Sequence, residues 1–180
     1  FERASDLAPN SHLHHEWLGY VEYQRQNSQR ALEHLLVALE IEPDATFALT
    51  TLGRIHIDRG QFEKALEYLR RAETLAPHDT IILGALAMSL HHTHRYDEAI
   101  AVFEFLLEHE PNNYRYWNNL GNIYRDIVQP KEANRCYQHA TVLDKRDPGP
   151  FSNWLTGLHY DPYMEREAIT RLAREWQIRF

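Results

Sequence analysis

The feature that most constrains the fold of this chain is a fixed spacing that recurs along most of its 180 positions. Proline, alanine, leucine and a small residue after that leucine all return at this interval. The columns are Pro9, Pro43, Pro77 and Pro111; Ala31, Ala65, Ala99 and Ala133; Leu18, Leu52, Leu86 and Leu120; and Gly19, Gly53, Ala87 and Gly121. A repeat of this length, about 34 residues, predicts small structural units that stack on one another.

Each repeating unit holds two short stretches with helical periodicity, such as "ALTTLGRIHIDRG" and "FEKALEYLRRAETLAP". Each stretch is long enough for one short helix. The small residue of the first stretch and the alanine of the second allow the two helices to cross closely, and proline ends the second helix. One such hairpin cannot bury its apolar face alone, so we predict an all-α, right-handed solenoid of stacked hairpins.

These columns resemble the tetratricopeptide repeat, a helix–turn–helix unit of about 34 residues. The resemblance implies the tail of a preceding repeat at residues 1–11, four repeats within 12–145 (12–45, 46–79, 80–113 and 114–147), and capping helices or the start of a following domain at 148–180. The fourth repeat departs from the pattern. It turns through "IVQPKEA", where Pro130 suits the first turn of a helix, and Lys145 replaces the closing proline.

In such a superhelix the first helix of each repeat lines a concave face, which we predict to be a peptide-binding groove. Its N-terminal part is apolar and aromatic, and its C-terminal part carries asparagine and arginine. The predicted groove residues are Tyr20, Phe47, Thr51, Arg54, Met88, Arg115, Asn118, Asn119, Asn122, Arg125 and Asn153. Asparagine amides both donate to and accept from a peptide backbone, and arginine binds carboxylates. The alternative is that these polar side chains are only solvated.

The composition narrows the possible partners. The net charge is −7 and no basic run occurs, which argues against a nucleic-acid partner. No apolar run is long enough to cross a bilayer, so a membrane partner is not expected. The single cysteine, Cys136, excludes an intrachain disulfide and suits a cytoplasmic location. We expect Cys136 on the outer side of a second helix and chemically inert.

The 12 histidines include two clustered stretches, "HLHH" at 12–15 and "HHTH" at 91–94. Neighbouring residues on a helix point in different directions, and no cysteine or carboxylate completes either set, so no metal site is predicted. No arrangement of catalytic residues or phosphate-binding loop appears, so we predict neither catalysis nor a cofactor within these residues. Trp17 and Trp117 are interpreted as packing residues.

The stretch "FSNWLTGLHYDP" at 151–162 breaks the spacing, with Leu155 and Glu167 where small residues would continue it. One interpretation is a capping segment, formed by a helix at 151–159 and a second apolar-faced helix containing Leu172 and Trp176. The other rests on resemblance. Together with "AREW" at 173–176, the stretch is similar to the segment that leads into the catalytic region of bacterial relatives of protein O-linked N-acetylglucosamine transferases and Spindly-type fucosyltransferases.

The sequence therefore predicts a non-catalytic module that binds a protein or peptide, with homo-oligomerisation through the repeats as a further possibility. The resemblance implies that the module is the substrate-recruiting arm of a nucleotide-sugar-dependent protein O-glycosyltransferase. Two alternatives stay open. One is a stand-alone adaptor or scaffold, and the other is a repeat arm joined to a different enzyme, such as a sulfotransferase.

Overall fold

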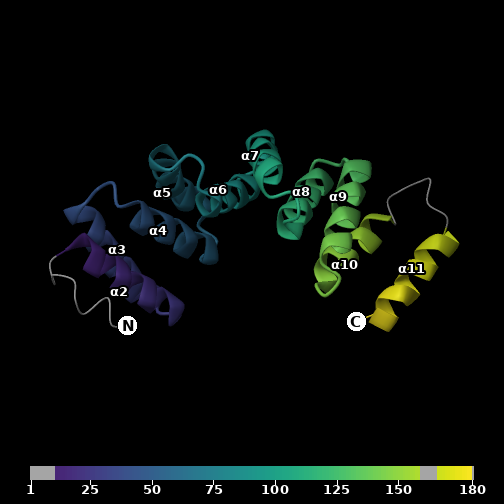
Figure 1. Ribbon diagram of the computed structural model, residues 1–180, viewed down its shortest axis with the longest axis horizontal. Helices are drawn as coiled ribbons and strands as arrows, with labels where there is room; N and C mark the ends of the chain where they lie inside the picture. The colour runs from purple at the N-terminus through teal and green to yellow at the C-terminus, as the bar shows by residue number, and fades with distance from the viewer. Residues whose placement is uncertain (1–10, 159–165, 180) are drawn as a thin grey trace. The chain divides into compact units, whose positions relative to one another are not determined.

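The computed structural model describes residues 11–158 and 166–179, and the regular structure in these ranges is entirely α-helical (Figure 1). The helices are α2 (His12–Gln24), α3 (Ser28–Ile41), α4 (Thr46–Asp58), α5 (Phe62–Leu75), α6 (Thr80–His92), α7 (Tyr96–His109), α8 (Tyr114–Asp126), α9 (Pro130–Leu143), α10 (Pro148–Leu158) and α11 (Arg166–Arg179). The predicted all-α class is confirmed. None of the described helices is both long and apolar enough to cross a membrane.

The chain forms two compact units, residues 1–95 (unit 1) and 96–180 (unit 2). The described part of unit 1 contains α2 to α6, and α2 packs on α3 as α4 packs on α5. Unit 2 contains α7 to α11, where α8 packs on α9, and α10 then packs on α9 and α11. In unit 1 the α2–α3 hairpin contacts α4 and the α4–α5 hairpin contacts α6, while in unit 2 the α8–α9 hairpin contacts α7 and α10 (Figure 1).

Within a hairpin, the small residue of the first helix lies against a large side chain of the second. A Cβ atom added to Gly53 would lie 2.6 Å from the Leu69 Cγ atom, and one added to Gly121 would lie 2.6 Å from the Tyr137 Cε1 atom. Both separations are shorter than any normal carbon–carbon contact. The prediction that small residues permit close helix crossing is confirmed at these positions.

The turns between first and second helices share one backbone conformation. Gln26, Gly60, His94 and Val128, each one repeat apart, have φ angles of 62°, 69°, 60° and 59°. In each turn the next residue donates a backbone hydrogen bond back to the last turn of the first helix, as Gln129 N does to the Tyr124 carbonyl at 2.8 Å. This is the Schellman arrangement, which satisfies carbonyls at a helix end. Pro130 follows it as the first residue of α9, as predicted.

The core of each unit consists of the periodic residues. The side chains of Ala31, Leu35, Leu52, Ala65 and Leu69 are fully buried in unit 1. The side chains of Phe103, Leu106, Tyr137, Ala140 and Phe151 are similarly buried in unit 2. Alanine and leucine at fixed spacing thus provide both the close approach and the apolar surface that holds neighbouring hairpins together.

The C-terminal segment differs from the prediction at its start. The "KRDPGP" stretch, expected only to interrupt the helix before it, supplies the first turn of α10, which begins at Pro148 rather than at residue 151. Asp147 accepts a hydrogen bond from Gly149 N at 2.8 Å. In α10 a Cβ atom on Gly157 would overlap the Asn134 side-chain oxygen of α9, so Gly157 is the small residue at this crossing. Tyr160, Asp161, Pro162 and Phe180 lie outside the described residues.

Candidate functional site

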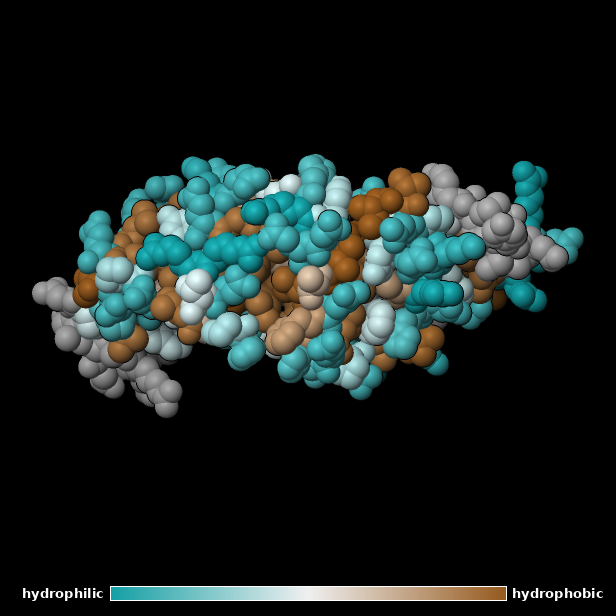
Figure 2. All heavy atoms as spheres, turned by 90° about the horizontal axis from the view of Figure 1, so that it is seen from above, coloured by the Kyte–Doolittle hydropathy of each residue, from teal (hydrophilic) through white to brown (hydrophobic). Residues whose placement is uncertain are grey.

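The first helices of unit 1 expose several large apolar side chains. Leu13, Trp17, Phe47, Ile81 and Met88 are all exposed, on α2, α4 and α6. Figure 2 shows hydrophobic side chains reaching the surface among hydrophilic ones on the face that it displays. Single exposed apolar residues are ordinary, so the argument depends on which of these side chains contact one another.

Trp17, Tyr20 and Phe47 form one aromatic cluster that joins α2 to α4. The ring centres are 6.1 Å apart for Trp17–Tyr20, 5.9 Å for Trp17–Phe47 and 5.4 Å for Tyr20–Phe47. Trp17 remains 43% exposed and Phe47 40% exposed, so the cluster presents aromatic surface to solvent. Trp17 packs on Tyr20 and Phe47, as interpreted from the sequence, and the rest of its ring is exposed on this surface.

Tyr23 of α2 makes two contacts with α4, a hydrogen bond to Asp58 and a cation–π contact with Arg54. The Tyr23 hydroxyl donates to the Asp58 carboxylate at 2.6 Å, and the Arg54 guanidinium lies 5.6 Å from the centre of the Tyr23 ring. Burial, followed by the Asp58 contact, raises the pKa of the Tyr23 hydroxyl. Arg54 is exposed, so its guanidinium is accessible to an acidic group of a partner.

Thr51, a predicted groove residue, is buried instead, and so is Glu16 on the preceding first helix. Thr51 is 4% exposed and its hydroxyl donates to the Phe47 carbonyl at 2.8 Å, so this side chain is not accessible to a ligand. Glu16 is also buried, and its carboxylate accepts a hydrogen bond from Ala48 N at 2.9 Å. That contact caps the start of α4, while burial raises the pKa of the Glu16 carboxyl.

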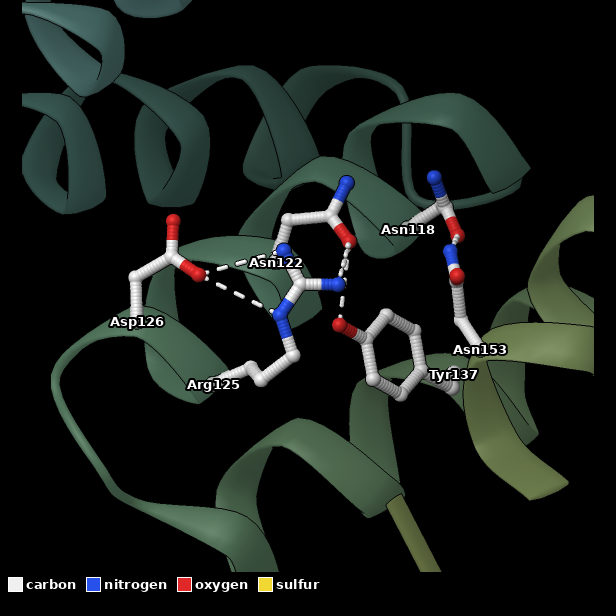
Figure 3. A network of polar contacts seen from close by, with 6 residues as sticks. All are labelled: Asn118, Asn122, Arg125, Asp126, Tyr137 and Asn153. Atoms are coloured by element: carbon white, nitrogen blue, oxygen red, sulfur yellow. Dashed lines mark hydrogen bonds and ion pairs between the residues drawn. The ribbon is translucent and has the colours of Figure 1, made fainter. Parts of the chain in front are cut away.

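In unit 2, asparagine side chains form a network between helices (Figure 3). Asn153 of α10 donates its side-chain N–H to the Asn118 oxygen of α8 at 3.0 Å. The Tyr137 hydroxyl of α9 donates to the Asn122 oxygen at 3.0 Å. The repeat register predicted Asn118, Asn122 and Asn153 but did not indicate Tyr137, whose ring is buried while its hydroxyl reaches the network.

The two arginines of α8 differ in their partners. Arg125 contacts the Asp126 carboxylate at 3.1 Å and the Asn122 oxygen at 3.4 Å, so its charge is already partly balanced (Figure 3). Arg115 is exposed, and its Nε donates to the hydroxyl of Tyr114 at 3.3 Å. Arg115 therefore remains available to a carboxylate, whereas Arg125 would have to exchange a partner.

Asn119 differs from the other amides of unit 2. It is partly exposed and makes no side-chain hydrogen bond to any residue in the described ranges. An amide in this state keeps both its donor and its acceptor for a ligand. The site residues thus gather in two surfaces: the aromatic cluster with Arg54 in unit 1, and the amide network with Asn119 and Arg115 in unit 2. Met88 is exposed on α6.

The remaining candidate groups form no recognisable reactive site. Among residues 11–158 and 166–179, no group of three or more histidine, cysteine or acidic side chains is arranged to hold a metal ion. Cys136 is 5% exposed, so the expectation that it lies on the outer side of its helix is wrong. Its burial, with Glu132 and Glu104 nearby, raises the pKa of the thiol to about 12, which disfavours the nucleophilic thiolate.

Comparison with known proteins shows that this chain belongs to the tetratricopeptide-repeat family. The tetratricopeptide-repeat family model matches residues 1–46, 50–104 and 93–133. A structure of MamA from Desulfovibrio magneticus RS-1 matches with a TM-score of 0.81 and 16% identity, covering 93% of this chain and 92% of that chain. Another MamA crystal structure gives 0.84 and 13%, covering 96% and 93%.

A structure of PilF from Pseudomonas aeruginosa matches with a TM-score of 0.77 and 23% identity, covering 94% of this chain and 74% of that chain. At these identities the structural matches establish the fold alone. Among curated proteins, no sequence matches this chain.

Proposed function

Since this chain belongs to the tetratricopeptide-repeat family, we propose that it is a protein-binding module whose first helices hold an extended segment of a partner. Repeat solenoids present long surfaces of this kind and supply binding rather than chemistry. In unit 1 the proposed contacts are the aromatic cluster Trp17, Tyr20 and Phe47. In unit 2 they are the amide network, and each surface is proposed by itself.

The observation that carries the proposal is the exposure of the aromatic cluster. Trp17 and Phe47 leave 43% and 40% of their surface in solvent although each ring has aromatic neighbours. Tryptophan and tyrosine dominate the binding free energy of many protein interfaces, because they bury a large area with few rotatable bonds. An apolar side chain of a partner would remove this surface from water.

The amides of unit 2 suit the partner's backbone rather than its side chains. Asn119 has a donor and an acceptor to offer, and a peptide group needs one of each. Arg54 and Arg115, both exposed, favour a segment that carries a carboxylate near these contacts. The proposed ligand is therefore an extended, acidic segment with at least one large apolar side chain.

The test is selection of a phage-displayed random peptide library on this chain, followed by calorimetry with the selected peptides. The double variant Trp17→Ala/Phe47→Ala should weaken binding about 30-fold or more, the loss expected for central aromatic residues. The matched control is Leu36→Ala/Ile41→Ala, which removes exposed apolar side chains from the second helix of the first hairpin. Unchanged affinity in the first variant, or equal loss in both, would reject the proposal.

We further propose, on the similarity of "FSNWLTGLHYDP" and "AREW" alone, that this module recruits substrates for a protein O-glycosyltransferase. The packing of α10 on α9 and the Asn153–Asn118 hydrogen bond are consistent with a segment that extends the amide network beyond the fourth repeat. The full-length gene product, incubated with labelled nucleotide sugars and a protein bearing the selected peptide, should transfer sugar to hydroxyl side chains. Without transfer, the stand-alone adaptor is the function that applies.

A further inference from the structure

Unit 2 has an open crevice on a different face from the amide network. Its volume is about 540 Å³, and it lies among α7, α8 and α9. Its lining residues are Glu104, Leu107, Glu108, Trp117, Leu120, Tyr124, Glu132, Arg135 and Cys136. On α8, Trp117, Leu120 and Tyr124 are spaced i, i+3, i+7 and share one helix face, whereas Asn118 and Asn122 point elsewhere.

The charged groups of this crevice have no partner among the described residues, whereas the Trp117 indole N–H donates to the Pro111 carbonyl at 2.8 Å and its ring centre lies 4.4 Å from that of His139. Glu104, Glu108 and Glu132 form no ion pair with any residue in the described ranges, and neither does Arg135. The Tyr124 hydroxyl makes no hydrogen bond there, and the Cys136 thiol, 5% exposed and also without a hydrogen bond to described residues, lies in the wall. Three carboxylates thus line a cavity with aromatic walls, and none of them forms an ion pair with a described residue.

The equivalent positions of unit 1, two repeats earlier, show why the crevice is open. There Tyr68 stacks on His56 with ring centres 5.5 Å apart and an interplanar angle of 5°. Cys136 takes the place of Tyr68, and Tyr124 takes the place of His56. A thiol is much smaller than a phenol, so the ring of Tyr124 has no stacking partner from this position of α9.

The charged residues that line the crevice also differ between unit 2 and the equivalent positions of unit 1. Leu36 and Lys64 of unit 1 correspond to Glu104 and Glu132 of unit 2, while Glu40 corresponds to Glu108. Two positions that are uncharged or basic in unit 1 are therefore glutamates in unit 2, where the stacking ring of Tyr68 is also replaced by Cys136. Glu104, Tyr124 and Glu132 line the same crevice, and burial, followed by the nearby negative charges, raises the pKa of the Tyr124 hydroxyl.

We propose that this crevice binds an arginine side chain of a partner protein, with the guanidinium against the Trp117 and Tyr124 rings and its N–H groups on the glutamates. A guanidinium is planar, stacks on aromatic faces and meets carboxylates with paired hydrogen bonds, so it complements both features of the crevice. Arg135 is the cation of the lining, and its like charge opposes the entry of a second guanidinium. This site is separate from the first-helix surfaces and does not depend on them.

The test is a titration of the ¹⁵N-labelled chain with the peptide acetyl-Gly-Arg-Gly-amide, followed by the indole N–H resonance of Trp117. The matched probe is acetyl-Gly-citrulline-Gly-amide, which keeps the shape of the side chain and lacks its charge. We expect a saturable shift at Trp117 with the arginine peptide only, while the indole resonances of Trp17 and Trp154 stay in place. Equal shifts with both peptides, or none with either, would reject the site.

Variants separate this site from the general attraction of an acidic chain for a basic peptide. Glu104→Gln/Glu132→Gln should weaken binding about tenfold, the size expected for losing charge-assisted contacts. Glu40→Gln/Glu67→Gln changes the net charge equally on exposed positions of unit 1 and should leave binding unchanged. If the two double variants weaken binding alike, the attraction is non-specific and the proposal fails.

Two further variants act on the crevice itself. Arg135→Ala removes the like charge from the crevice and should tighten binding several-fold. Cys136→Tyr copies the side chain that unit 1 has at this position and should abolish binding by filling the space. Circular dichroism checks that Cys136→Tyr is folded. Should it not fold, Arg135→Ala and the glutamate variants decide the question, and weaker or unchanged binding in Arg135→Ala would overturn the proposed arrangement.

Discussion

The α4–α5 hairpin of unit 1 and the α8–α9 hairpin of unit 2 are the same structural unit two periods apart. They agree where their helices cross, since Gly53 and Gly121 each lie beneath a large buried side chain, Leu69 and Tyr137 respectively. They diverge at positions away from the crossing. The repeat pattern constrains how closely the two helices of a hairpin approach each other. It does not constrain which side chains form the surfaces on the two faces of the hairpin.

The divergence affects both faces of the hairpin. On the first helix, Thr51 is buried in unit 1, whereas its counterpart Asn119 is partly exposed in unit 2, with an amide that bonds to no described residue. On the second helix, Tyr68 stacks on a neighbouring histidine, whereas its counterpart Cys136 leaves a crevice. Each hairpin can thus evolve a binding surface without any change in how its helices pack.

The largest expected effect comes from the side chains beneath the two glycines. Tyr137→Ala should lower the free energy of unfolding by about 3–5 kcal/mol, and Leu69→Ala by about 2–5 kcal/mol, because each leaves a cavity in the core. Tyr137→Phe keeps the ring and removes only the hydrogen bond to Asn122, so it should cost about 1 kcal/mol. Urea unfolding gives all three values. A loss in Tyr137→Phe as large as in Tyr137→Ala would contradict the packing argument.

The turns provide a reciprocal exchange between the two hairpins. Val128 has a φ angle of 59°, where a β-branched side chain is strained, and Gly60 adopts nearly the same conformation without strain. Val128→Gly should raise the free energy of unfolding by about 1–2 kcal/mol, and Gly60→Val should lower it by a similar amount. Val142→Gly in α9 is the control, since glycine in a regular helix destabilises. If Val128→Gly destabilises as Val142→Gly does, the strain is absent.

The fold was predictable because the periodic residues act through sterics that the sequence displays directly. Alanine and glycine columns indicate close crossings wherever they occur. The shared turn conformation was visible only at Gly60, because Gln26, His94 and Val128 are not residues that favour a positive φ. These three adopt it since the hairpin geometry and its hydrogen bonds require it, which is a property of the whole unit rather than of one residue.

For the candidate site, the sequence indicated which residues share a helix face but not how far each side chain is buried. The register listed Tyr20 and Phe47 together, and their rings are in contact; it also listed Asn118, Asn122 and Asn153, of which Asn118 and Asn153 share a hydrogen bond while Asn122 accepts from Tyr137. That these residues bind a peptide stays a prediction. It could not show that Thr51 is covered, because burial depends on the neighbouring helix. For the same reason it put Cys136 on the outside.

A smaller effect separates the amides of unit 2 from one another. Asn153→Ala removes the donor to Asn118 and should lower the free energy of unfolding by about 1 kcal/mol. Asn119→Ala removes no hydrogen bond to a described residue and should change it by less than about 0.5 kcal/mol. Its effect should appear instead in peptide affinity. Equal losses of stability in the two variants would remove the distinction between structural and ligand-binding amides.

The smallest expected effect is a pH dependence that compares Glu16 with Asn118, which occupy the same register position in the first and fourth repeats. Both accept a hydrogen bond from the next first helix, Glu16 from Ala48 N and Asn118 from Asn153, but only Glu16 titrates. Burial raises the pKa of Glu16 in the folded chain, so the folded state holds its proton more tightly than the unfolded chain does.

The contribution of Glu16 to stability is therefore fully present below the pKa of the unfolded chain, and it is lost as the pH rises through the folded value. Glu16→Gln keeps an oxygen for Ala48 N and removes the titration. Urea unfolding of both proteins between about pH 4 and pH 7 should show the wild type losing stability relative to the variant as the pH rises. A difference that is constant across this range, or that grows with pH in favour of the wild type, would mean that the carboxylate is well solvated or well paired. In the case of a constant difference, the buried cap of α4 would be as insensitive to pH as its amide counterpart in unit 2.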